Sequence, residues 1–179
     1  TASYQCEGGW QEGGRVESMW DVYLHENHLE NGDVASDHYH RFREDIRMMK
    51  EGGQNSYRFS LAWPRIIKNR EGEVNQEGID FYNRLIDACL EYGITPMVTI
   101  FHWDLPQYLE EKGGWLNRDT CVAYTHYAKV CFERFGDRVK LWATFNEPRY
   151  YTNSGYLIGN YPPGHQDIQE TVTASYYMM

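Results

Sequence analysis

Apolar positions recur with two different periods along the chain, and their alternation predicts repeated strand–helix units. Between Asp37 and Glu51 the apolar residues are spaced by three, four and three positions, which is typical of an amphipathic helix with one face on a core. Gly52 and Gly53 follow directly and predict the end of this helix. The next segment, NSYRFS at 55–60, predicts a short strand.

The same order of elements continues toward the C-terminus. A second helix is expected over 75–93, with Asn75 as its N-cap and Gly93 at its end. ITPMVTIF at 94–101 is a continuous apolar run, which predicts a strand covered on both faces. A third helix is expected over 117–135, the next buried strand is KLWATFN, and a fourth helix begins at 167.

The repeated units restrict the fold to two architectures, a doubly wound open sheet or a closed (β/α)8 barrel. A nucleotide-binding sheet would carry G-x-G-x-x-G or a P-loop, and EGGWQEGG at 7–14 matches neither pattern. If TASYQ at 1–5 is the tail of a first strand, the chain holds four βα units. Because a whole barrel needs about 250 residues, residues 1–179 predict the N-terminal half of a single (β/α)8 TIM barrel.

Composition and charge exclude several classes of protein. Hydrophobic residues make up 41% of the chain and aromatic residues 16%, which is too apolar for a disordered chain. The 15 Tyr and 6 Trp suit stacking on sugar rings or bases and serve core packing equally well. A net charge of -9 without a Lys/Arg cluster argues against nucleic acid as a partner. The apolar runs are too short to span a membrane.

The cysteines and the two chain ends bear on location and completeness. The four cysteines show no CxxC pair, and Cys121 and Cys131 lie too far apart along one predicted helix to bridge. Reduced cysteines and the absence of a basic-then-apolar leader suit a cytoplasmic protein. The chain starts at TASYQ and stops at Met179 within a predicted helix, so we expect both ends to be cut ends.

Polar side chains stand where the expected strands end. In barrels of this kind chemistry gathers at the C-terminal ends of the strands. A single histidine at such a place is more often structural, but four successive strand ends with hydrogen-bonding groups favour a shared site. The groups are an amide, a guanidinium, an imidazole with an indole, and an amide with an acid: Gln5, Arg58, His102 with Trp103, and Asn146 with Glu147.

Five segments carry a family resemblance: TASYQCEGGW, NGDVASDHYHRF, NSYRFSLAWPRI, FHWDLPQ and TFNEP. In this order and spacing they resemble glycoside hydrolase family 1, the β-glucosidase family, over essentially the whole chain. The resemblance implies a (β/α)8 barrel, retaining hydrolysis of β-linked glucosides or galactosides, a β-glycoside or oligosaccharide substrate, and no cofactor. It also implies that Glu147 is the acid/base and that the amide of Asn146 binds the sugar 2-hydroxyl.

The resemblance assigns the remaining strand-end residues as well. Gln5, His102 and Trp103 match residues that line the pocket for the non-reducing sugar, and packing beneath the rim is the alternative for Trp103. Arg58 matches the arginine that keeps the nucleophile ionised through its positive charge. A purely structural barrel ion pair is the alternative for Arg58.

The second catalytic carboxylate of the family is not found in the chain. The family's nucleophile lies in an (I/V)-T-E-N-G segment, and no such segment occurs here. Asp104 is expected to hold its own loop, and Glu44 and Asp45 lie on a helix outside the barrel. None of the three is expected at the separation of about 5–5.5 Å from Glu147 that retaining chemistry requires. The isolated chain is therefore expected to be inactive.

A half barrel would also leave two unpaired strand edges and an uncovered apolar face. We expect a missing C-terminal half, self-association or partial disorder to compensate. A non-catalytic sugar-binding or scaffold half-barrel that keeps Gln5, His102 and Asn146 is an alternative function.

Two further features concern substrate and metal. SYQ at 3–5 and Pro148 match the branch of the family that acts on non-phosphorylated sugars, and the 6-phospho-β-glucosidase branch stays open as an alternative. Arg149 stands where many members carry Trp, so the preference for the leaving group is open. HENH at 25–28 is not H-E-x-x-H, and Asp37 with the neighbouring histidines suits a helix start, so no metal site is expected.

Overall fold

The computed structural model describes all residues 1–179 and contains one three-stranded parallel sheet in the order β1-β2-β3. The strands are β1 (Ser56–Ser60), β2 (Thr95–Phe101) and β3 (Leu141–Phe145). The helices that carry or surround them are α1 (Ser3–Cys6), α2 (Met19–Glu26), α3 (His38–Glu51), α4 (Trp63–Ile66), α5 (Gln76–Glu91), α6 (Gln107–Glu110), η1 (Gly114–Leu116), α7 (Arg118–Phe135), α8 (Pro148–Thr152), η2 (Asn153–Ile158) and α9 (Ile168–Met178).

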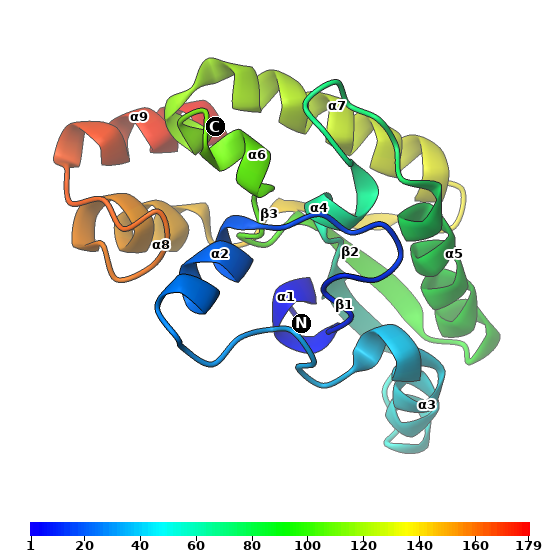
Figure 1. Ribbon diagram of the computed structural model, residues 1–179. Coiled ribbons are helices and arrows are strands. Elements are labelled where there is room, and N and C mark those ends of the chain that lie inside the picture. Colours follow the sequence, from blue (N-terminus) through cyan, green and yellow to red (C-terminus); the bar gives the residue numbers. More distant parts are fainter.

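The long helices follow one another in an arc around the sheet (Figure 1). Helix α3 contacts α5, and α7 contacts α9, as neighbouring helices of a barrel do. Each of α5 and α7 connects two parallel strands, so β1-α5-β2 and β2-α7-β3 are two βαβ units. The β/α alternation and the ranges expected for these helices are confirmed.

The core lies between β2 and the helices that cover it. Val98, Ile100 and Phe101 of β2 are completely buried, as the continuous apolar run of this central strand predicts. On the helical side Trp63 stacks on Tyr127, with ring centroids 4.9 Å apart and planes 4° from parallel. Such stacks add to the stability that comes from burying the rings. This core fixes the position of the strand ends.

The N-terminal segment TASYQ does not end a strand as expected, because Ser3–Cys6 form the helical turn α1. Only Thr1 pairs with β1: its amino nitrogen donates to the oxygen of Arg58 across 2.7 Å, and the nitrogen of Ser60 donates to the oxygen of Thr1 across 3.1 Å. These are the two bonds of a parallel ladder. The first strand expected at TASYQ is thus reduced to one paired residue beside β1.

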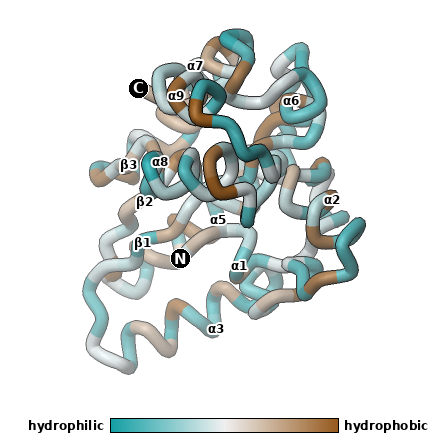
Figure 2. Tube along the Cα trace, turned by 90° about the vertical axis from the view of Figure 1, so that its left-hand side faces the viewer, coloured by the Kyte–Doolittle hydropathy of each residue, from teal (hydrophilic) through white to brown (hydrophobic).

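Strand β3 is not buried as its sequence predicts. Leu141 at its start is 48% exposed, and none of its five residues is fully buried. The reason is that β3 is the last strand of the sheet and has a neighbour on one side only. Exposed apolar residues also occur on α9 at Ile168, Val172 and Tyr176, which lie one helical turn apart. Figure 2 shows hydrophobic segments near β3 and α9.

Two residues at helix starts do not act as the caps expected. Asn75 precedes α5, but its side-chain nitrogen donates to the main-chain oxygens of Gly13 and Arg65, across 2.6 and 2.9 Å. Asp37 precedes α3 with φ 54° and binds the ring of His40 instead of a helix amide. Asn75 thus links segments that are distant in the sequence, and Asp37 binds a residue of the first helical turn. The local sequence does not reveal either contact.

The four cysteines are free thiols. None of the helices combines the length and the apolar character needed to cross a bilayer.

Candidate active site

The ends of β2 and β3 meet because the two strands are in register. Phe101 pairs with Phe145, and the main-chain nitrogen of Asn146 donates to the oxygen of Phe101 across 2.9 Å. Two residues beyond Phe101, the indole nitrogen Nε1 of Trp103 donates to the main-chain oxygen of Asn146 across 2.7 Å. The polar residues that follow the two strands therefore lie side by side, as expected from a parallel sheet.

Arg58 links all three strands. Its side chain leaves β1 and crosses β2, where Nε donates to the hydroxyl of Thr99 across 2.9 Å. Its Nη2 then donates to the side-chain oxygen Oδ1 of Asn146 across 2.8 Å. The guanidinium has no carboxylate partner within the chain, so the structure does not show the barrel ion pair that was the alternative for Arg58.

A pocket of about 450 Å³ opens beside these strand ends. Three of the predicted residues, Gln5, His102 and Trp103, line it. Glu147 and Asn146 are not among its lining residues, and the bonds of Asn146 to Trp103 and Arg58 connect them to it. The structure thus assembles Gln5, His102 and Trp103 around one cavity, and Glu147 lies outside its lining, directly after the residue bonded to Trp103.

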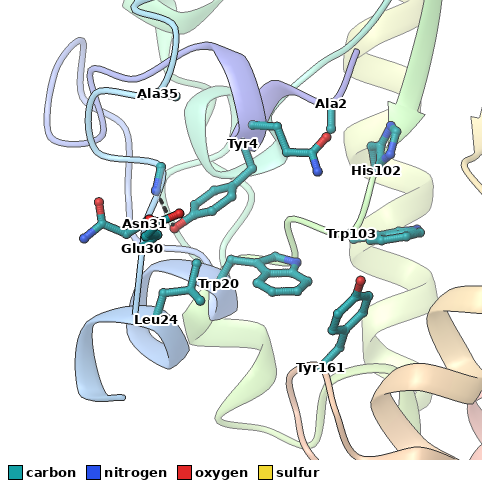
Figure 3. A pocket seen from close by; sticks show the side chains of 12 residues that line it. Ala2, Tyr4, Trp20, Leu24, Glu30, Asn31, Ala35, His102, Trp103 and Tyr161 are labelled. Carbon is teal, nitrogen blue, oxygen red and sulfur yellow. Dashed lines mark hydrogen bonds between the residues drawn. The ribbon is translucent and has the colours of Figure 1, made fainter. Parts of the chain in front are cut away.

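Aromatic side chains form one side of this pocket (Figure 3). The ring of Tyr161 lies 5.2 Å from Trp20 and 5.9 Å from Trp103, measured between centroids. On the outer side of Trp103, Tyr150 stacks at 5.6 Å with planes 18° apart. The sequence hints at this wall only through its excess of Tyr and Trp, because Trp20 and Tyr161 belong to no predicted strand end.

His102 is uncharged at neutral pH in this environment. Burial lowers the pKa of its imidazole to about 4, and the positive charge of Arg58 acts in the same direction. Its Nδ1 is buried and has no hydrogen-bond partner within the chain. A neutral imidazole can donate from one nitrogen and accept at the other, which suits a hydroxyl group better than an anion.

Glu147 occupies an unusual backbone position directly after Asn146. Its φ is 44°, in the left-handed region, and it immediately precedes α8. The side chain of Glu147 is exposed, and its carboxylate forms no hydrogen bond or ion pair with another side chain of the protein. Trp103 has φ 77°, so both strand ends turn through a conformation that non-glycine residues rarely adopt. Backbone strain of this kind is common at functional sites.

Asp104 anchors the loop that follows β2. It is buried, and its Oδ2 accepts a hydrogen bond from the hydroxyl of Ser3 across 2.8 Å. It therefore ties this loop to the turn α1, which carries Gln5, a partner that the sequence did not predict. Burial raises the pKa of the Asp104 carboxyl to about 7.

A buried ion pair that the sequence analysis did not predict supports the N-terminal loop. Arg65 Nε lies 3.2 Å from Glu7 Oε2, and the side chains are 0% and 6% exposed. The hydroxyl of Tyr82 donates to the other oxygen of Glu7 across 2.6 Å. Arg65 also donates to the main-chain oxygen of Gly8 across 3.1 Å. The pair fixes the loop that follows α1, and no sequence period signals it.

The other acids considered in the sequence lie on the outer helix α3. Glu44 accepts from Arg41 across 2.9 Å, and Asp45 binds the ring of His38 across 2.6 Å. Both carboxylates are engaged away from the strand ends.

Comparisons with known proteins agree on one family. The profile described as Glycosyl hydrolase family 1 matches residues 1–179. Beta-glucosidase A of Acetivibrio thermocellus is 47% identical over 185 residues, covering 100% of this chain and 41% of the relative. Beta-glucosidase A of Thermotoga maritima is 50% identical over 172 residues, covering 94% of this chain and 39% of the relative.

Solved structures give the same result. The β-glucosidase from Thermotoga maritima in complex with azafagomine superposes with a TM-score of 0.96 at 48% identity, over 99% of this chain and 42% of that one. The psychrophilic β-glucosidase BglU from Micrococcus antarcticus superposes with a TM-score of 0.95 at 46% identity, over 99% and 39%. The chain thus spans about 40% of the length of these relatives and has the backbone of part of a TIM barrel.

Proposed function

The chain belongs to glycosyl hydrolase family 1, and from this membership we propose that it supplies the acid/base and one wall of the sugar pocket of a retaining β-glucosidase. The observation that carries the proposal is the bond from Trp103 Nε1 to the oxygen of Asn146. It joins the pocket-lining strand end to the residue that directly precedes Glu147.

Glu147 is proposed as the group that gives a proton to the leaving oxygen and later takes one from water. Both steps need a carboxyl that changes its protonation state during the reaction and can reach solvent. The exposed side chain of Glu147, with no side-chain partner in the chain, meets this requirement. General acid–base groups of this kind contribute about 10²–10⁴-fold to the rate.

The sugar is proposed to bind to neutral hydrogen-bonding groups. Gln5 offers an amide and His102 an uncharged imidazole, and both line the pocket with Trp103. Asn146 contributes its amide from the end of β3. Amide and imidazole groups both donate and accept, which matches neighbouring hydroxyls that do the same. β-linked glucosides or galactosides are the proposed substrates.

The second carboxylate is proposed to come from outside residues 1–179. Retaining hydrolysis uses two carboxyl groups about 5–5.5 Å apart, and the other acids considered, Asp104, Glu44 and Asp45, are engaged elsewhere. The guanidinium of Arg58 lies at the strand ends without a carboxylate partner, and it would hold an incoming carboxylate in its charged form. The isolated chain is therefore proposed to be inactive.

The partner proposed for the open sheet is the rest of the barrel. Its strands would cover the free edge of β3, where Leu141 is exposed, and the neighbouring side of α9. The superposition over 99% of this chain but about 40% of the relatives supports this occupant. Pairing of two copies of the chain along the same edges is the competing outcome of the experiment below.

A fusion tests the proposal directly. Residues 1–179 are joined to the part of the Thermotoga maritima β-glucosidase A that lies beyond its match to this chain, and hydrolysis of an aryl β-glucoside is measured for the fusion and for residues 1–179 alone. We expect turnover by the fusion and none by the chain alone. A folded fusion without activity, or a chain that turns over substrate as fast as the fusion, would contradict the proposal.

Sugar binding without catalysis is a second candidate for the isolated chain. The pocket with Gln5, His102 and Trp103 is formed without any further chain. Calorimetric titration of residues 1–179 with azafagomine, the ligand in a similar structure, measures ligand binding by the isolated chain. A sugar-binding module is favoured if this chain binds azafagomine and the fusion does not hydrolyse the aryl β-glucoside.

A further inference from the structure

Thr99 is a buried polar residue in the middle of β2, directly beneath the strand ends. It is 1% exposed, and its hydroxyl accepts a hydrogen bond from Arg58 Nε across 2.9 Å. A β-branched residue is common in a strand, so its presence alone has no functional meaning. The hydrogen bond between Thr99 and Arg58 does point to a function, because Arg58 is exposed and has only two side-chain partners, Thr99 and Asn146.

Arg58 determines how the amide of Asn146 is oriented. A guanidinium only donates hydrogen bonds, so the atom of Asn146 that lies 2.8 Å from Nη2 must be the oxygen Oδ1. The amide nitrogen Nδ2 then points away from Arg58. It has no hydrogen-bond partner within the chain, and it is not among the enclosed polar atoms. It is available to donate to a ligand.

We propose that Thr99 is a positioning residue: by holding Arg58 it fixes the amide of Asn146 so that Nδ2 donates to a hydroxyl of the bound sugar. This inference rests on the proposed function for the identity of the ligand. The relay itself, from Thr99 through Arg58 to Asn146, is independent of it.

The relay needs Thr99 because an arginine side chain is long and flexible. Without the acceptor at Nε, one bond to Asn146 remains, and a guanidinium at an exposed position then samples several rotamers. The amide of Asn146 loses the contact that distinguishes its oxygen from its nitrogen. In half of its orientations it would present an acceptor where a donor is needed.

The charge of Arg58 gives a second way to follow the relay. It helps to lower the pKa of His102, after the larger effect of burial. If Arg58 leaves its position, that pKa rises toward the ordinary value of histidine. A purely structural role of Thr99 in the strand would not move it.

Two substitutions separate the hydroxyl from the shape of the side chain. Thr99→Val keeps the branched shape and removes the acceptor, and Thr99→Ser keeps the acceptor. The first readout uses residues 1–179 alone: the Nε–H signal of Arg58 and the titration of the His102 ring, both by NMR. We expect Thr99→Val to shift the Arg58 signal and raise the pKa of His102, with Thr99→Ser close to the unsubstituted chain.

The second readout uses the fusion described above and compares a β-glucoside with its 2-deoxy analogue. We expect Thr99→Val to reduce the preference in kcat/KM for the glucoside about tenfold, the effect of one lost hydrogen bond, and Thr99→Ser to preserve it. An unchanged Arg58 signal and His102 titration in Thr99→Val overturn the relay, whatever the activity. Changed NMR signals with an unchanged preference in kcat/KM show that Asn146 does not donate to the sugar, and a fusion without activity counts against the proposed function only.

Discussion

The indole nitrogen of Trp103 donates a hydrogen bond to the main-chain oxygen of Asn146 across 2.7 Å. The bond connects the residues that follow β2 and β3, and both Trp103 and Glu147, the neighbour of Asn146, have positive φ. Two strained turns thus hold each other in place at the mouth of the pocket. The position of Glu147 depends on this contact rather than on any partner of its own carboxylate.

Replacing Trp103 by Phe removes the indole donor and keeps an aromatic ring against Tyr150. We expect kcat/KM of the fusion to fall at least tenfold, because one hydrogen bond that fixes Asn146 is lost. Trp142→Phe is the matched control, since it removes an indole bond from β3 to the main-chain oxygen of Val139, outside the pocket. Equal losses in the two variants would contradict a specific role for Trp103.

The buried carboxyl of Asp104 predicts how stability changes with pH. Its pKa is raised to about 7 in the folded chain, above the ordinary value of about 4. The folded state therefore binds more protons between these values, and the free energy of unfolding falls as the pH rises from about 4 to about 7. Glu110, whose pKa burial also raises to about 7, acts in the same direction.

Urea unfolding of Asp104→Asn at several pH values checks this sign. The amide still accepts from Ser3 and cannot ionise, so we expect a weaker fall in stability between pH 4 and 7. The total fall in the free energy of unfolding between pH 4 and 7 should shrink by about 1.4 kcal/mol for each unit of pKa shift that the substitution removes. Glu71→Gln, at an exposed acid, is the control and should leave the slope unchanged. A slope equal to that of the unsubstituted chain in Asp104→Asn would refute the prediction.

The ion pair of Arg65 and Glu7 is predicted to be a main determinant of stability near the N-terminus. Glu7→Gln leaves the guanidinium buried without a countercharge, which costs about 3–5 kcal/mol. The same change at Glu91, whose pair with Arg43 is exposed and screened by water, should cost far less. Chemical denaturation of both variants measures the difference, and similar costs would show that burial of the pair is unimportant.

The open edge of the sheet predicts self-association of residues 1–179 in isolation. Leu141 exposes its side chain at the free strand β3, and unpaired edges with apolar residues pair with other chains. We expect Leu141→Lys to reduce the concentration-dependent increase in mass seen by analytical ultracentrifugation. Val122→Lys, at an even more exposed apolar residue on α7, should not. The edge is not the contact if both changes act alike, or if the chain stays monomeric.

Local periodicity was sufficient to predict the helices α3, α5 and α7 and the strands β1 and β2. The spacing of Phe42 and Ile46, or the apolar run through Val98, depends on burial within the chain itself. The burial of β3 could not be predicted correctly, because the apolar residues around Leu141 do not reveal that β3 ends the sheet and has a neighbouring strand on one side only. The hydrophobic pattern of a strand predicts the environment in which the strand is stable, and it does not show whether a neighbouring strand is present.

The candidate site divides in the same way. Strand ends and motif resemblance predicted Gln5, His102 and Trp103, which line one pocket. Trp20 and Tyr161 were missed because they come from a short helix and a loop with no periodic signal. The contacts of Asp104 with Ser3 and of Arg65 with Glu7 join residues 101 and 58 positions apart, and a single sequence gives no measure of such pairs.

The role of Glu147 as the acid/base is tested most directly by the dependence of the fusion on the leaving group. A dinitrophenolate leaves without a proton, whereas an alkoxide needs one from a general acid. We predict that Glu147→Ala lowers kcat/KM for an alkyl β-glucoside about 10²–10⁴-fold and affects the dinitrophenyl β-glucoside far less. Equal losses for the two substrates, or no loss for either, would contradict the assignment of Glu147.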